Sequence, residues 1–196
     1  MSTIAHFNNE RNTNAGERMS RDDAWANWIR DTVRQFESPL LLYATRIVGS
    51  AEDAQDIVQE TFLRLCAQKP ESISDHLNIW LFSVCRNCAL ELRRKRSREA
   101  ELNDPAKDAV VSPEVQVSKA AENKETLSEV MRAISKLPPS QQEVIRLKFE
   151  YGLSYREISA ITELSVTNVG FMIHAGLKKV RERVAQVPKP AAVTLQ

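Results

Sequence analysis

A chain of 196 residues with 42% hydrophobic and 27% charged residues is long enough for one large or two small globular domains. No apolar run approaches the roughly 20 residues that span a bilayer, and the polar N-terminus lacks a signal-peptide core, so we expect a cytoplasmic protein without membrane insertion. The net charge of +1 excludes a wholly basic surface, but acidic residues concentrate at 52–60 and 99–108 and basic ones at 86–98 and 178–189, which favours local contacts with polyanions.

Helices should dominate, because the chain has only five glycines and no alternating Val/Ile-rich run. Residues 1–20 are polar and lack periodicity, which predicts a disordered tail. Apolar residues then recur at helical spacing from Trp25 up to Gly49, a plausible C-cap. Pro39 lies within this pattern and marks either a kink or the start of a fresh helix.

A second helix is predicted over 51–65, with Ser50 as its N-cap and Asp53 as the partner in a capping box. Its inward face is apolar, whereas its outward face carries acidic and amide side chains. Such a face is either an ordinary solvated surface or a docking face for a basic helical partner.

A loop over 69–75 precedes a third helix, predicted from about His76 to Arg98. The last six positions of this helix, 93–98, carry five basic residues. The run is either a solvated helix C-terminus or a segment that binds phosphates. Trp80 lies on the same helix and is suited to stacking on unstacked bases, although a half-buried core position is an equal alternative.

Residues 101–119 contain Asn, Asp, Ser and Pro without periodicity, which predicts a linker. The fold class is therefore all-α, with two small helical domains joined by a flexible linker. The predicted boundaries are a tail at 1–20, domains at 21–100 and 120–186 with the linker between them, and a second tail at 187–196.

The second domain contains a helix-turn-helix. Before it, an amphipathic helix ends at Pro138-Pro139, and the next helix is predicted to be capped by Ser140 and to end near Gly152. Ser154 and Ser165 then cap two short helices joined by a tight turn, an arrangement that places the second helix in a DNA major groove. The apolar positions predicted to face the core are Val166, Val169, Ile173, Leu177 and Val180. A helical hairpin that does not bind DNA is the alternative.

No catalytic or metal-binding constellation emerges. Cys85 and Cys88 form a C-x-x-C within a helical pattern, with only Cys66 and His76 as plausible nearby partners, whereas zinc sites need a second pair of ligands. We expect buried core cysteines, with metal binding or redox sensing as the alternative. There is no glycine-rich phosphate loop and no nucleophile with a histidine partner, which predicts a protein that is not an enzyme and uses no cofactor.

Several segments together resemble the extracytoplasmic-function (ECF) sigma factors of the sigma-70 family. AEDAQDIVQETFLRL (51–65) resembles the region 2 core, and WLFSVCRNCALELRR (80–94) resembles the promoter-melting helix. LPPSQQEVIRL (137–147) followed by GLSYREI (152–158) is similar to region 4. The matches occur in the family's order with the expected linker between them.

The resemblance implies an alternative sigma factor that binds core RNA polymerase, recognises the −35 and −10 promoter elements and helps to melt the promoter. An anti-sigma factor is expected as regulator. In the family, the helix matching 51–65 docks on the β′ clamp, and the matching residues are Asp56, Gln59, Glu60 and Leu63. The implied −10 residues are Asn78, Trp80, Arg86, Asn87, Arg93 and Arg94. The candidate −35 residues are Tyr155, Arg156, Thr167, Asn168, Phe171, His174 and Lys178.

The helix-turn-helix departs from the family pattern at two places. Glu163 stands in the turn where the family usually has glycine, which costs about 1 kcal/mol if the residue is left-handed. The last helix carries Gly170, Phe171 and Gly176 where the family has a basic face, so its −35 preference does not carry over. The main alternative is a stand-alone helix-turn-helix regulator with a helical sensing domain, and a structural helical adaptor is the third hypothesis.

Overall fold

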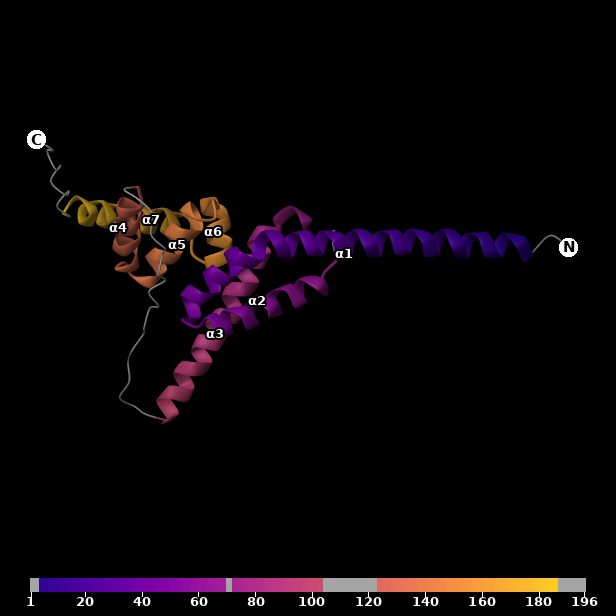
Figure 1. Ribbon diagram of the computed structural model, residues 1–196, viewed down its shortest axis with the longest axis horizontal. Coiled ribbons are helices and arrows are strands. Elements are labelled where there is room, and N and C mark those ends of the chain that lie inside the picture. The colour runs from indigo at the N-terminus through magenta and orange to yellow at the C-terminus, as the bar shows by residue number, and fades with distance from the viewer. Residues whose placement is uncertain (1–3, 70–71, 104–122, 187–196) are drawn as a thin grey trace, which may run out of the picture. The chain divides into compact units, whose positions relative to one another are not determined.

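The computed structural model describes residues 4–69, 72–103 and 123–186, and its regular elements in these ranges are helices (Figure 1). The chain divides into two compact units, 1–113 and 114–196. This confirms the predicted all-α class and the two helical domains. Residues 104–119 of the predicted linker and the predicted tail at 187–196 lie outside the described residues.

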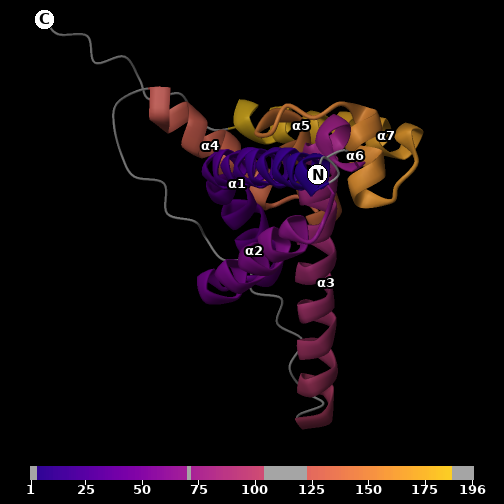
Figure 2. The same ribbon diagram turned by 90° about the vertical axis from the view of Figure 1, so that its right-hand side faces the viewer.

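The first unit is a bundle of three α-helices that pack on one another. A short 3-10 helix comes directly before the third of them. Its elements are α1 (Ile4–Val48), α2 (Ala51–Cys66), the 3-10 helix (Ser74–His76) and α3 (Leu77–Asn103). The fully buried side chains at its centre are Leu40, Ala44, Ala54, Thr61, Leu65, Leu81, Cys85 and Ala89. Figure 2 shows that α3 extends well beyond α1 and α2, which leaves its second half uncovered.

The structure has helix where the sequence predicts a loose tail over 1–20, because α1 begins at Ile4. No proline precedes Pro39, and the polar residues of this segment are compatible with helical backbone even without an apolar stripe. The helix also continues through Pro39 to Val48, which excludes a fresh helix start at that proline.

Gly49 and Ser50 cap the ends of α1 and α2 as predicted, and the structure shows one half of the capping box predicted for Ser50 and Asp53. Gly49 adopts a left-handed conformation (φ 79°), and its N–H donates to the Thr45 carbonyl at 2.8 Å. The Ser50 hydroxyl oxygen accepts the N–H of Asp53 at 3.3 Å. At its far end, α3 runs five residues beyond the predicted Arg98, since residues 99–103 favour helix and Pro105 is the first residue that must stop it.

The second unit packs three helices around α7. Its elements are α4 (Asn123–Ser135), α5 (Pro139–Phe149), α6 (Tyr155–Thr162) and α7 (Val166–Ala185), and α7 contacts each of the others. Its core contains Val144, Ile145, Leu147, Ile158, Ile161, Val169 and Ile173. The predicted cap at Ser140 is wrong: α5 starts at Pro139 after Pro138, since proline fits the first helical position, where no N–H is needed. The helix ends at Phe149, three residues before the predicted Gly152.

The helix-turn-helix is present as predicted. Ser154 and Glu157 form a reciprocal capping box, with the Ser154 N–H donating to Glu157 Oε2 at 2.7 Å. Glu163 in the turn is left-handed (φ 61°), and the Ser165 hydroxyl oxygen accepts the N–H of Asn168 at 3.2 Å. One predicted core position is wrong: Val166 is 43% exposed, because it lies in the first turn of α7, ahead of the buried stripe.

Candidate binding surfaces

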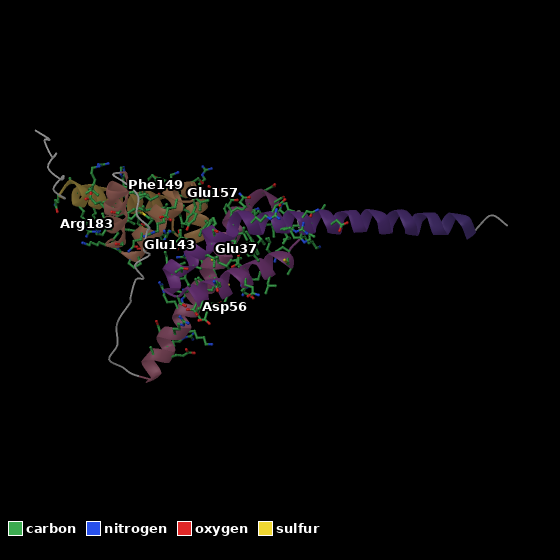
Figure 3. The ribbon with its side chains drawn as sticks, in the orientation of Figure 1. Glu37, Asp56, Glu143, Phe149, Glu157 and Arg183 are labelled. Carbon is green, nitrogen blue, oxygen red and sulfur yellow. The ribbon has the colours of Figure 1, made fainter. Side chains whose placement is uncertain are left out.

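A groove between α1 and α2 is the first candidate surface. Its lining residues are Val33, Glu37 and Leu41 from α1 and Gln55, Val58, Gln59, Phe62, Leu63 and Cys66 from α2. The Leu63 side chain is 59% exposed, so it adds apolar surface to the groove that a partner can cover. Figure 3 marks Glu37 and Asp56, which add acidic charge to these two helices.

Of the four residues predicted to dock a protein partner, Gln59 and Leu63 line the groove, whereas Asp56 and Glu60 are exposed on α2 outside its lining. Glu60 accepts a hydrogen bond from Arg64 Nε at 2.7 Å on the same helix. Sequence reasoning missed Glu37 and Leu41. The available signal was that Val33, Glu37 and Leu41 follow one another at intervals of four residues along α1, since residues so spaced share one helix face.

The cysteines differ sharply in their environments. Burial, with a smaller contribution from nearby Cys88, raises the pKa of Cys85 to about 12. Burial also raises the pKa of the half-buried Cys88. Thiols held neutral are poor nucleophiles and metal ligands, which favours the core interpretation of this pair. Among the described residues, no group of three or more His, Cys, Asp or Glu side chains is placed to hold a metal ion.

The second candidate surface is the polar side of α3. Trp80, Asn87 and Arg94 are spaced by seven residues, or about two helical turns, so they lie on one face, away from the buried stripe of Leu81 and Cys85. Asn87 and Arg94 are exposed and Trp80 is half-buried. Of the other predicted residues, Asn78 and Arg93 are exposed and Arg86 is half-buried.

One arginine of the basic run contacts another helix. Arg96 donates to both carboxylate oxygens of Asp53 at 2.5 and 2.6 Å, which ties the second half of α3 to the first turn of α2. Partial burial acts to raise the pKa of Asp53, but hydrogen bonds from Arg96 and Ser50 and the charge of Arg96 outweigh it, so the pKa is lowered. Sequence periodicity could not reveal this pair, because its members are 43 residues apart.

The outward face of α7 is the third candidate surface. Its exposed residues include Thr167, Asn168, Phe171, His174 and Lys178, five of the candidate −35 residues predicted from the sequence. The Phe171 side chain is 70% exposed. The opposite face is buried through Val169, Ile173, Gly176 and Val180.

Two glycines of α7 meet neighbouring helices. A Cβ on Gly176 would lie 2.5 Å from Ile145 Cδ1 of α5, so this glycine permits close helix packing and belongs to the core, not to the altered outer face that the sequence suggested. Gly170 lies beside the ring of Tyr155, where a Cβ would meet Tyr155 Cε2 at 3.5 Å. Lys148 Nζ stands 5.5 Å from the centre of the same ring, and the adjacent Arg156 is exposed.

The basic end of α7 is partly engaged within the unit. Arg183, marked in Figure 3, donates through Nη1 to the Ala133 carbonyl at 3.2 Å and thereby ties α7 to α4. Lys178 lies 4.0 Å from Glu182, and both side chains are exposed. Lys178, Lys179 and Arg181 are exposed and remain available to a polyanion.

None of the described helices combines the length and apolar character needed to cross a membrane. This holds for α1 and α3 despite their 45 and 27 residues, because both are rich in charged side chains.

Comparisons with known proteins follow the division into two units. Residues 32–99 match the family model "Sigma-70 region 2", and residues 127–180 match "Sigma-70, region 4". The ECF RNA polymerase sigma factor SigM of Bacillus subtilis is 33% identical over 155 residues, which cover 76% of this chain and 86% of that protein. SigE of Mycolicibacterium smegmatis is 27% identical over 157 residues, 80% of this chain but only 61% of that longer protein.

A solved structure has the same fold. It is the sigma factor RpoE of Bartonella quintana in complex with the anti-sigma factor NepR, with a TM-score of 0.63 and 23% identity. The similarity covers 82% of this chain and 98% of that one.

Proposed function

Because this chain belongs to the ECF family of RNA polymerase sigma factors, we propose that it binds core RNA polymerase, recognises the −35 and −10 elements of its promoters and helps to melt them. The observation that carries the proposal is the presence, in one unit, of both a groove with an exposed leucine and a helix with an outer arginine-bearing face. A sensing domain needs neither surface, whereas a subunit that joins polymerase to DNA needs both.

The α1–α2 groove would bind a helical segment of the polymerase. Burial of the exposed Leu63 side chain by a partner would remove apolar surface from water and provide an anchor for the interface. Glu37 and Asp56 make the surroundings acidic, which favours a basic partner surface and a fast, oriented encounter.

The outer face of α3 would hold the −10 element as a single strand. Arg93 and Arg94 are exposed and would contact phosphates, and the half-buried Trp80 would offer a ring on which a base can stack. Unstacking one base costs a few kcal/mol, which stacking and hydrogen bonds on the protein can recover. Melting in this proposal is therefore driven by binding, and the chain performs no covalent chemistry itself.

The second unit would bind the −35 element as a duplex, with α7 in the major groove. Arg156 and Lys178 lie on separate helices of this unit and suit phosphate contacts beside the groove. In this arrangement, the exposed side chains at the start of α7 would contact the bases.

We also propose that the chain acts in the cytoplasm under the control of an anti-sigma factor. The support is the relative RpoE, whose structure was solved with the anti-sigma factor NepR. Such a partner would compete with polymerase or promoter for the surfaces described above.

Gel filtration with core RNA polymerase tests the proposal. The parent chain should co-elute with the polymerase, and an Asp56→Arg/Leu63→Arg variant should not, because it places positive charge and bulk on the proposed docking surface. Asp31→Arg is the matched control: it changes one exposed acidic residue of α1 that lies two positions before Val33, on the opposite side of the helix from the groove.

Co-elution that survives the double substitution would move polymerase binding away from this groove. Failure of the parent chain to co-elute, with duplex DNA binding intact, would favour the stand-alone regulator instead.

A further inference from the structure

The first three turns of α7 carry no lysine or arginine. From Glu163 through Leu177 the chain contains only one acidic residue and one histidine among its titratable groups. At the centre of this uncharged surface stands Phe171, whose side chain is 70% exposed. Contact of this ring with an apolar group of a ligand would remove apolar surface of both from water.

Cations border this surface on two sides. Arg156 is exposed at the beginning of α6, while Lys178, Lys179 and Arg181 are exposed along the last turns of α7. Phosphates of a duplex would therefore be neutralised at the edges, whereas the base edges in the groove would meet Phe171 and its neighbours. Thr167 and Asn168 lie one turn before Phe171 on the same face.

The major-groove edges of the bases differ in apolar surface, which is the property that a phenylalanine side chain can distinguish. Guanine, cytosine and adenine present hydrogen-bond donors or acceptors there, whereas thymine adds a methyl group. A phenyl ring pressed on a polar edge displaces water without replacing its hydrogen bonds, which is unfavourable. The same ring on a methyl group buries apolar surface on both partners.

We propose that Phe171 is a specificity-determining residue of α7 and packs on the methyl group of a thymine in the −35 duplex. This inference rests on the proposed function and adds to it the chemical group that the helix recognises. Base selection by α7 then depends on apolar contact and on Thr167 and Asn168, not on an arginine.

The test uses the complete chain assembled with core RNA polymerase. Duplexes are first selected from a library randomised upstream of the −10 element, and each thymine of the selected −35 site is then replaced singly by deoxyuridine, which lacks only the methyl group. At one position, we expect this replacement to weaken binding about three- to fivefold for the parent chain. The Phe171→Ala variant should bind the two duplexes equally, and Phe171→Leu should retain part of the difference.

Phe149→Ala is the control, because Phe149 is 61% exposed in the same unit but lies at the end of α5. It should preserve the parent's preference for thymine over uracil. Thermal unfolding of each variant monitors folding, which loss of a largely exposed ring should leave intact.

Two failures are distinguishable. A selected −35 site in which every thymine tolerates uracil, or which contains no thymine, overturns the inference about Phe171 and leaves the proposed function standing. Failure of the parent complex to select any −35 sequence overturns the proposed function, and the inference with it.

Discussion

Two glycines in α7, six residues apart, face different neighbours. Gly176 is buried where α7 crosses α5, and the space for its missing side chain is occupied by Ile145. Gly170 is half-buried beside the Tyr155 ring, with room for a methyl group in ordinary contact. The same substitution should therefore have opposite effects at the two positions.

We expect Gly176→Ala to lower the free energy of unfolding by about 1 kcal/mol. A methyl group 2.5 Å from Ile145 Cδ1 forces a buried side chain to move, and such overpacking costs about 1–3 kcal/mol. The better helix propensity of alanine returns up to about 1 kcal/mol. Gly170→Ala is the control: it gains the propensity without the clash and should raise stability. Urea unfolding measures both, and equal effects would contradict the packing argument.

At the scale of elements, the Asp53–Arg96 pair joins the beginning of α2 to the extended half of α3. It connects the helix proposed to dock polymerase with the helix proposed to hold melted DNA. Arg96 thus holds α3 against α2 within a basic run whose neighbours Arg93 and Arg94 are exposed and are proposed to bind phosphate.

Asp53→Asn should make unfolding less sensitive to acid. The lowered pKa of Asp53 means that its stabilisation is fully present above the unfolded-state pKa of about 3.9 and is lost as the pH falls through the folded-state value. The side chain of Arg96 is 51% exposed, so the loss at neutral pH should be only about 1 kcal/mol. Urea unfolding between about pH 5 and pH 2 measures the slope. Asp31→Asn, in an ion pair exposed at both ends, is the control and should leave the stability at neutral pH as in the parent.

Sequence reasoning succeeded where the deciding interactions are local. The caps at Gly49, Ser50, Ser154 and Ser165 depend on residues within four positions, and each prediction is confirmed.

What sequence reasoning missed depends on distances between elements. The contribution of α1 to the groove, the partner of Arg96 and the close approach of Gly176 to Ile145 all require knowing which helices touch. The length of α1 was missed for another reason. A polar helix lacks the apolar stripe that periodicity detects, so its first turns look the same as a loose tail.

At the scale of the whole molecule, each of the two units has its own set of fully buried side chains. We therefore expect substitutions in one unit to leave the stability of the other unchanged. Hydrogen exchange followed by mass spectrometry measures this. In the Gly176→Ala variant, backbone amides should exchange faster than in the parent only in α4–α7, and in the Asp53→Asn variant only in α1–α3. Faster exchange in both units from either substitution would show that the chain unfolds as one cooperative body.

The different exposure of the three cysteines gives the chain a natural attachment site for a fluorescent dye. All three cysteines are described, and only Cys66 is exposed, on the lining of the α1–α2 groove. Cys85 is buried and Cys88 is half-buried, and burial raises the pKa of each, so a maleimide dye at neutral pH will attach to Cys66 first. Fluorescence from that position follows occupation of the groove in the natural sequence, without an engineered cysteine.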